Sequence, residues 1–176
     1  MRQQIATAGS VQSAVIAQDR AQKLRVPLYT PQERVRRDES RWTLVQGVLA
    51  PVQFLVFLIS LALVLRTLFT GEGVEAAGIS VVIKTFVLYT IMVTGAIWEK
   101  VVFGRYLFAP AFFWEDVFSM LVIALHTAYV IAYYNNMGSE RDLLLLALAA
   151  YFTYVINAGQ FIWKLRMARL DAAAAS

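Results

Sequence analysis

Four long stretches of the chain are apolar and almost free of charge. The first runs from residue 42 to 65, and similar stretches follow at about 76–98, 115–135 and 143–163. An α-helix needs about 20 apolar residues to cross a bilayer. The pattern therefore predicts an all-α, polytopic membrane protein whose four transmembrane helices form a bundle.

The regions outside these stretches are polar. Residues 1–41 lack a long apolar core, so we expect no cleavable signal peptide. Within them, Thr30-Pro31-Gln32-Glu33 predicts a helix start, because the Thr hydroxyl can cap a free amide, Pro fits the first helical position and Glu can reach back. Apolar positions between 11 and 21 indicate a further, weakly amphipathic helix. We therefore expect a basic N-terminal segment with a short interfacial helix, a transmembrane domain over 42–170 and a disordered tail over 171–176.

The composition supports this interpretation. Of the 176 residues, 59% are hydrophobic and 16% are charged, whereas a soluble domain carries about 45–50% apolar and about 25% charged residues. One small core could not bury this excess. There is no cysteine, which excludes disulfides, thiolate metal sites and cysteine nucleophiles.

Basic residues are distributed unevenly about the predicted spans. Thirteen Lys and Arg residues fall in the N-terminal segment, the second loop and the C-terminal tail, whereas the opposite side has only Arg66 and Arg141. Loops rich in Lys and Arg remain in the cytoplasm. The bias predicts that both termini are cytoplasmic.

Polar side chains recur on single faces of the first and fourth spans. We favour hydrogen bonding between helices as their role, and the alternative is a ligand cleft edged by amides. Lys84, in the outer half of the second span, is expected to extend to the outer face; binding or pairing with a carboxylate is its alternative. The polar faces consist of Gln46, Gln53 and Ser60, and of Thr153, Asn157, Gln160 and Lys164.

The third span carries a stripe of Glu115, Ser119, Val122 and His126, because these positions nearly coincide in helical angle. His126 lies about 16 Å deeper than Glu115 at a rise of about 1.5 Å per residue. The imidazole has three open roles. It could be a hydrogen-bonded structural group, one axial ligand to a tetrapyrrole metal, or a proton shuttle.

Three acidic residues are expected at the cytoplasmic side of the bundle. Glu115 and Asp116 open the third span, and Glu99 closes the second. Close carboxylates in a low-dielectric site raise one of the two pKa values, which supplies an acid and a base together. The alternative is that these residues form interfacial ion pairs with Lys100 and Arg105.

The loop between the second and third spans is aromatic, with six such residues between Val102 and Trp114. An interfacial aromatic belt explains this enrichment, and a mouth for a large flat ligand is the alternative. This loop lies in the longest of four stretches by which the chain resembles the 3-vinyl (older name 2-vinyl) bacteriochlorophyllide hydratase family. The resemblance covers residues 28–170. The stretches are Leu28–Pro31, Trp42–Gly47, Ile97–Met120 and Tyr154–Phe161.

The resemblance implies an enzyme, a hydro-lyase that adds water to the C3 vinyl group of chlorophyllide a or 3-vinyl bacteriochlorophyllide. Such a hydration needs a general acid, a general base and a positioned water, but no cofactor. We assign the acid and base to Glu115 and Asp116, with Glu99 in support. His126 could ligate the substrate magnesium, and the propionate could meet Lys100 or Arg105. The expected substrate contacts are His126, Tyr89, Asn157, Gln160, Lys100, Arg105 and Trp114.

The expected partners are the pigment, water and membrane lipid, in the cytoplasmic or intracytoplasmic membrane of a phototrophic bacterium. Nucleic acid is not expected, and association with other pigment-biosynthesis enzymes or into an oligomer stays open. A membrane protein that binds pigment or assists photosystem assembly without catalysis is the alternative function. A small transporter subunit that uses Lys84 and the amides is a weaker one.

Overall fold

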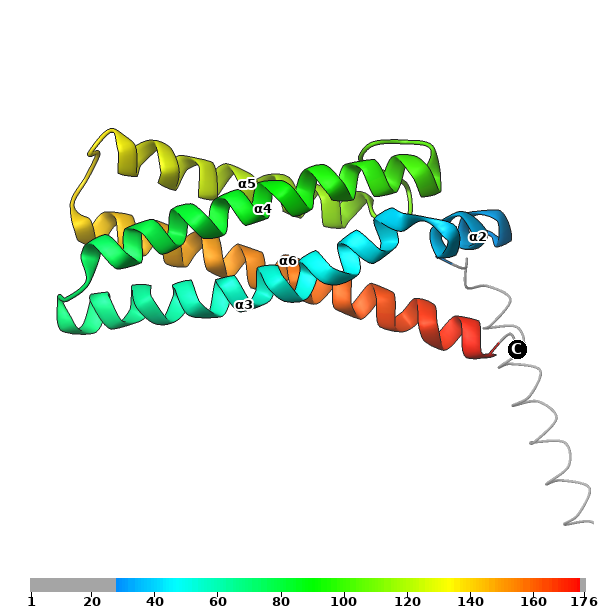
Figure 1. The fold of residues 1–176 in the computed structure, drawn as a ribbon, viewed down its shortest axis with the longest axis horizontal. Coiled ribbons are helices and arrows are strands. Elements are labelled where there is room, and N and C mark those ends of the chain that lie inside the picture. The colour runs from blue at the N-terminus through cyan, green and yellow to red at the C-terminus, as the bar shows by residue number, and fades with distance from the viewer. Residues whose placement is uncertain (1–27, 175–176) are drawn as a thin grey trace, which may run out of the picture.

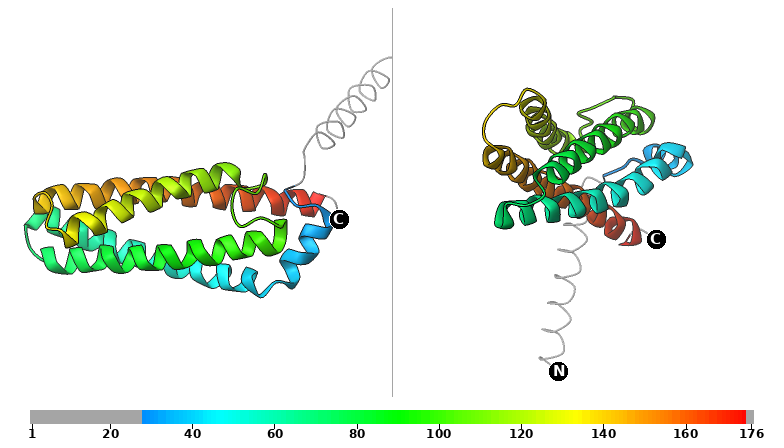
Figure 2. Two further views of the ribbon diagram at one scale, coloured as in Figure 1. Left: turned by 90° about the horizontal axis from the view of Figure 1, so that it is seen from above. Right: turned by 60° about the vertical axis from the view of Figure 1, so that its left-hand side comes forward.

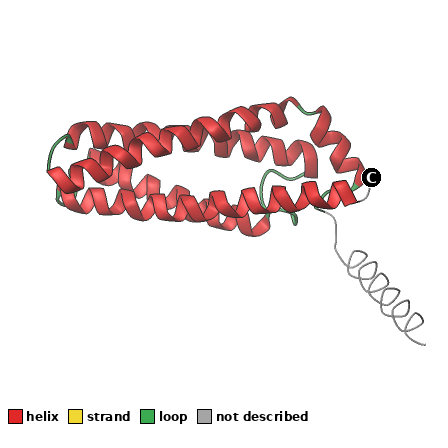
Figure 3. Cartoon of the chain, turned by 90° about the horizontal axis from the view of Figure 1, so that it is seen from below, coloured by secondary structure: helices red, strands yellow, loops and turns green. Residues whose placement is uncertain are grey.

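A computed structural model describes residues 28–174, with side chains as far as Leu170. The described part of the chain is helical throughout, without strands (Figure 3). The expected helix between residues 11 and 21 lies outside it. The helices are α2 (Pro31–Glu39), α3 (Arg41–Thr70), α4 (Val74–Phe103), α5 (Phe113–Tyr134) and α6 (Glu140–Ala174).

The four long helices confirm the predicted four spans, because each is long and apolar enough to cross a membrane. The short helix α2 begins as expected: the Glu33 N–H donates to the Thr30 hydroxyl at 3.3 Å and the Thr30 N–H donates to the Glu33 carboxylate at 2.8 Å. Helix α6 is longer than expected. It continues past residue 163 to Ala174, into the segment predicted as a tail.

The bundle is apolar outside and partly polar inside, the reverse of a soluble protein. Large apolar side chains such as Leu44, Phe86 and Phe152 are more than half exposed. The interior instead contains fully or nearly fully buried polar side chains. Lipid is the solvent that matches such a surface. The buried polar residues of the spans include Gln53, Ser60, Lys84, Thr85, Glu99, Glu115, Asp116, Ser119, His126 and Asn157.

The four spans form two helical hairpins, α3 with α4 and α5 with α6 (Figure 2). The α3–α4 turn contains Gly71 and Gly73 with φ of 74° and 81°, a conformation that glycine adopts at little cost. Packing within each hairpin is more extensive than packing between the hairpins. We call the interface between the two hairpins the seam.

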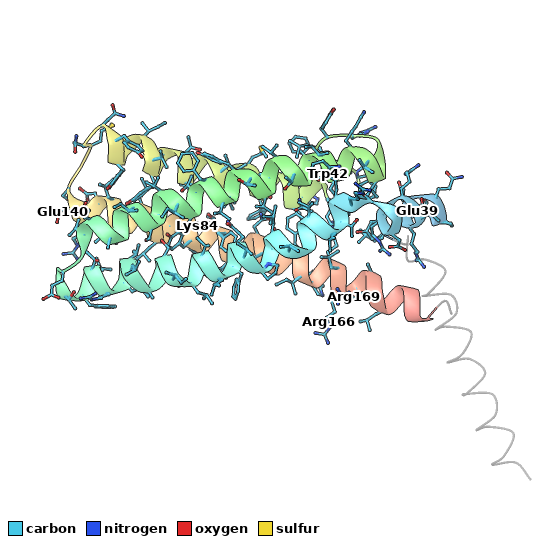
Figure 4. All side chains as sticks on the ribbon, in the orientation of Figure 1. Glu39, Trp42, Lys84, Glu140, Arg166 and Arg169 are labelled. Atoms are coloured by element: carbon cyan, nitrogen blue, oxygen red, sulfur yellow. The ribbon has the colours of Figure 1, made fainter. Side chains whose placement is uncertain are left out.

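The two ends of the bundle differ in charge. Helix α2, the α4–α5 loop and the C-terminal part of α6 lie at one end (Figure 1), which we call the basic end. Arg166 and Arg169 on α6 lie toward this end, whereas Glu140 marks the opposite one (Figure 4). The Lys and Arg residues are therefore segregated along the bundle axis as the sequence predicted.

Candidate functional site

Two apolar clusters occupy the bundle interior. The larger includes Phe57, Leu88, Val122 and Tyr154, and the smaller, at the basic end, is built around Tyr29, Val102 and Phe112, with Trp98, Phe103 and Phe161 packed on it. On α5, Glu115, Asp116 and Ser119 come between Phe112 of the smaller cluster and Val122 of the larger one. On α6, Asn157 and Gln160 lie between Tyr154 and Phe161, whereas Glu99 on α4 lies beside the smaller cluster, between Trp98 and Val102, and Gln53 on α3 lies one turn before Phe57 of the larger one. We call this set the polar layer: Gln53, Glu99, Glu115, Asp116, Ser119, Asn157 and Gln160.

A pair of carboxyls lies in the polar layer at the seam. Glu99 on α4 and Asp116 on α5 are 5% and 2% exposed, and the two carboxyls accept from the consecutive amides of Phe108 and Ala109, which brings them together. Neighbouring carboxyls in a buried site favour a shared proton, because two adjacent negative charges repel each other. Two carboxyls, one from each hairpin, are thereby placed side by side.

Consecutive backbone amides of the α4–α5 loop hold this carboxyl pair. The Phe108 N–H donates to Asp116 Oδ2 at 2.7 Å, and the Ala109 N–H donates to Glu99 Oε2 at 3.2 Å. Phe108 has a φ of 58°, in the left-handed region that costs a non-glycine residue about 1–3 kcal/mol. The surroundings maintain this strain, which lets both amides face the two carboxyls.

Glu115 belongs to the same layer but has a different partner. Its Oε2 lies 2.5 Å from Lys164 Nζ, and the ammonium also lies over the Phe112 ring at 5.1 Å. The sequence led us to pair Asp116 with Glu115, with Glu99 in support, whereas the structure brings Asp116 to Glu99. Glu115 forms a neutralised ion pair beside them.

Lys100 and Arg105, the alternative ion-pair partners that we considered for these three acids, have other surroundings. Lys100 Nζ donates to the Gly104 carbonyl at 2.9 Å and lies over the Tyr106 ring, and Arg105 is exposed. Neither forms an ion pair with the three carboxyls among the residues that the structure describes. Both are at the basic end, Lys100 in the last turn of α4 and Arg105 in the α4–α5 loop whose amides hold the carboxyl pair.

The preferred prediction for Lys84, extension to the outer face, is wrong. Lys84 is fully buried inside the bundle (Figure 4), because it has internal partners: its Nζ lies 2.7 Å from His126 Nε2 and 4.0 Å from the centre of the Tyr154 ring. His126 Nδ1 lies 2.7 Å from the Val122 carbonyl, to which it donates. With both ring nitrogens engaged, ligation of magnesium would require Lys84 to move away.

The predicted polar faces are buried or half-buried, and most of their members serve as links between helices. Gln46 Nε2 donates to Thr94 Oγ1 at 2.8 Å, Ser60 lies 2.5 Å from the Tyr151 hydroxyl, and Asn157 Nδ2 donates to Ser119 Oγ at 2.7 Å. These contacts match the hydrogen-bonding role that we favoured.

Other atoms in these faces have no partner. Gln53 is 2% exposed, yet neither of its amide atoms is hydrogen-bonded to any part of the chain that the structure describes. Asn157 Oδ1 and Gln160 Oε1 are likewise buried without a partner there. Buried polar atoms are rarely left unsatisfied, so this side of the layer calls for a bound polar molecule.

The remaining predicted substrate contacts are divided between interior and surface. The Tyr89 hydroxyl lies 2.7 Å from Thr127 Oγ1, which joins α4 to α5 across the seam. Trp114 is 67% exposed and lies on the lipid-facing side of α5. Within residues 28–170, no group of three or more acidic or histidine side chains is arranged to hold a metal ion.

Sequence reasoning did not identify the role of α2. Tyr29 is buried and stacks on Phe103 with ring centres 5.7 Å apart, and Arg37 lies 4.7 Å from the centre of the Tyr29 ring. Burial raises the pKa of the Tyr29 phenol, and the Arg37 guanidinium offsets part of that rise. Arg36 Nε donates to the Val102 carbonyl at 2.8 Å. Helix α2 is thereby fixed to the end of α4, beside the loop that holds the carboxyls.

Comparison with known proteins gives a consistent result. A family model described as 2-vinyl bacteriochlorophyllide hydratase matches residues 29–167. The 2-vinyl bacteriochlorophyllide hydratase of Cereibacter sphaeroides is 72% identical over 149 residues, which cover 84% of this chain and 92% of that protein. The protein of the same name from Rhodobacter capsulatus is 69% identical over 149 residues, covering 85% of this chain and 86% of its own. No solved structure matches the chain. The chain therefore belongs to the 2-vinyl bacteriochlorophyllide hydratase family.

Proposed function

We propose that this protein adds water to the C3 vinyl group of chlorophyllide a or 3-vinyl bacteriochlorophyllide, giving a 3-(1-hydroxyethyl) group. Membership of the family supports a hydratase of bacteriochlorophyll synthesis. The observation that supports this chemistry most directly is the Glu99–Asp116 pair, which is buried and is held by two consecutive backbone amides.

The hydration proceeds by general acid–base catalysis. The protonated carboxyl of the pair donates its proton to the terminal vinyl carbon, where a C–H bond forms from the π electrons. The inner carbon becomes cationic, and the conjugated macrocycle delocalises this charge. A water oxygen then bonds to the inner carbon, and the ionised carboxyl removes a proton from that water. The pair ends with one proton, as it began, so no other reactant is needed.

Glu115 supports this pair without taking part in proton transfer. Its ion pair with Lys164 neutralises the charge of the third carboxylate, which leaves one transferable proton in the layer. Glu115 lies three residues after Phe112, which belongs to the smaller apolar cluster. The ion pair with Lys164 on α6 therefore fixes the start of α5 relative to α6. Asp116 is thereby presented to Glu99.

The pigment enters from the membrane and lies against the seam, with its vinyl group at the carboxyl pair. Lys100 and Arg105, at the basic end, suit its propionate, because they are cations without an acidic partner among the described residues. Trp114 offers an aromatic surface on the lipid-facing side. Of the other predicted contacts we retain Asn157 and Gln160, which have unpartnered oxygens, because Tyr89 and His126 are already bonded to Thr127 and Lys84.

The basic end faces the cytoplasm in this proposal. Positively charged loops stay on that side of a membrane, and α2, the α4–α5 loop and the end of α6 carry seven of the twelve Lys and Arg residues between 28 and 174. Catalysis then takes place near the cytoplasmic surface of the membrane of a phototrophic bacterium.

Hydration can be tested with membranes that contain the protein, 3-vinyl chlorophyllide and water labelled with oxygen-18. Mass spectrometry should detect a product that carries one labelled oxygen. We expect Glu99→Gln and Asp116→Asn each to reduce the rate by about 10²–10⁴-fold, the usual contribution of a general acid or base. Glu75→Gln, which changes an exposed carboxyl near the opposite end, is the matched control and should retain the wild-type rate.

Two results would contradict the proposal at different points. Wild-type rates in both carboxyl variants would remove the pair from the mechanism. Intact protein that retains pigment but never alters its vinyl group would instead favour a pigment-binding role.

A further inference from the structure

The unpartnered amides of the polar layer lie at one level of the bundle. The contact between Ser60 on α3 and Tyr151 on α6 fixes the register of these antiparallel helices. Toward the basic end, Gln53 lies seven residues from Ser60 and Asn157 lies six residues from Tyr151, each a rise of about 10 Å. Gln53 and Asn157 therefore lie at about the same depth.

A row of polar side chains connects this level to the carboxyls. On α6, Asn157 is followed by Gln160 and then by Lys164 at spacings of three and four, which place all three on one face. Lys164 binds Glu115, which is adjacent in sequence to Asp116. The row therefore leads from the depth of Gln53 to Glu115, the neighbour of Asp116 in sequence.

The types of unpartnered atom indicate what is bound there. Three are carbonyl oxygens, those of Gln53, Asn157 and Gln160, and one is the Gln53 amide nitrogen, all counted within the described residues. A ring ketone of the pigment could accept from the nitrogen but would leave three acceptors unsatisfied. Water both donates and accepts, and a buried water typically makes about three hydrogen bonds. If the oxygen and nitrogen of any of these amides are exchanged, the unpartnered atoms still include both donors and acceptors. The bound molecule must therefore still both donate and accept hydrogen bonds.

We propose that Gln53, Asn157 and Gln160 hold a short file of water molecules that supplies the reacting water to the Glu99–Asp116 pair. The catalytic part of this inference rests on the proposed function. The residues beside the layer explain why a dedicated site is needed: Phe57, Leu88 and Val122 are buried and apolar, and the two carboxyls are almost inaccessible from outside. Bound water in this layer brings the second substrate to a region that otherwise excludes it.

Gln53→Leu tests the proposal, with Gln46→Leu as the matched control on the same helix. Gln53→Leu removes two unpartnered polar atoms, so the bundle should keep its unfolding midpoint, and pigment affinity should be unchanged. The turnover rate should fall at least about tenfold, because the attacking water loses its position. Gln46→Leu breaks a hydrogen bond to Thr94, so it should lower the unfolding midpoint and leave turnover at the wild-type level.

Radiolytic hydroxyl-radical footprinting provides a second measurement that does not depend on turnover. Water held in the layer generates radicals there, which oxidise neighbouring aromatic side chains. Phe57 and Tyr154, which are buried and adjacent in helical position to Gln53 and Asn157, should be oxidised in the wild type and protected in Gln53→Leu. The Gln46→Leu control should show the wild-type pattern.

The outcomes separate this inference from the proposed function. Unchanged turnover and an unchanged footprint in Gln53→Leu would overturn the water site, and the hydratase assignment would stand. Loss of pigment affinity with normal turnover would overturn it as well, because the amides would then bind the macrocycle. A wild-type footprint without any hydrated product would support the water site and refute the proposed reaction.

Discussion

Replacing Lys84 or His126 alone should destabilise the bundle far more than replacing both together. The two side chains are fully buried, and the Lys84 Nζ lies 2.7 Å from His126 Nε2. Lys84→Met leaves the imidazole nitrogen without a donor, and His126→Phe leaves the amine without an acceptor. The double variant contains two apolar side chains and leaves neither group unpaired.

The magnitudes follow from the surroundings of each group. An unsatisfied buried acceptor costs about 1–3 kcal/mol, so Lys84→Met should cost about 2 kcal/mol. A lysine without a partner at the centre of a membrane helix costs about 2.5–3.5 kcal/mol. The Tyr154 ring, 4.0 Å from Nζ, offsets about a third of this through a cation–π contact of about 1 kcal/mol, so His126→Phe should cost about 2 kcal/mol.

Two independent effects of this size would lower the free energy of unfolding of the double variant by about 4 kcal/mol. We expect instead that it differs from that of the wild type by at most about 1 kcal/mol. The measurement is equilibrium unfolding of all four proteins in mixed micelles, followed by tryptophan fluorescence. Additive costs in the double variant would refute the reasoning. So would a negligible cost for His126→Phe, because it would mean that the lysine can reach the membrane surface without its partner.

Three further predictions address other parts of the molecule. Lys164→Met leaves the nearly buried Glu115 without its cation and should cost about 2–3 kcal/mol in the same unfolding assay, with partial recovery in Lys164→Arg. Gly47 lies inside α3 with no atom within 4 Å of an added Cβ, so Gly47→Ala should stabilise the bundle by about 0.5–1 kcal/mol; a loss of stability would show that the glycine has a packing role. Because the chain has no cysteine, single cysteines can report orientation: in intact spheroplasts an impermeant maleimide should label Asn136→Cys and spare Arg105→Cys, and the reverse would invert the topology.

The features that depend on local sequence were predicted well. The spans followed from the length of charge-free sequence, and the start of α2 followed from the capping box between Thr30 and Glu33. Helical angle alone identified the inward stripe of α5, since Glu115, Ser119 and His126 are all buried. These predictions succeeded because the period of a helix is fixed by its hydrogen bonds and does not depend on neighbouring elements.

The pairing of side chains between helices could not be derived in this way. Glu115 and Asp116 are adjacent in sequence, so a helix rotation of about 100° decides which of them meets Glu99. That rotation depends on the α4–α5 loop, in which the left-handed residue is Phe108 and not the glycine that such a conformation usually signals. Lys84 was misplaced for a related reason: α4 is apolar around most of its circumference, and the partner His126 lies 42 residues away.

The solvent of this bundle explains why its polar residues are informative. In lipid, an apolar side chain gains little by turning inward, so the helices associate through close packing and through polar contacts. Gln46, Ser60, Tyr89 and Lys84 fit this role, because each reaches a partner on another helix. Gln53 does not, since leucine would fill its place without an unsatisfied amide. A buried glutamine that contributes nothing to assembly, at the depth of the half-satisfied Asn157, is better explained by what it binds than by what it supports.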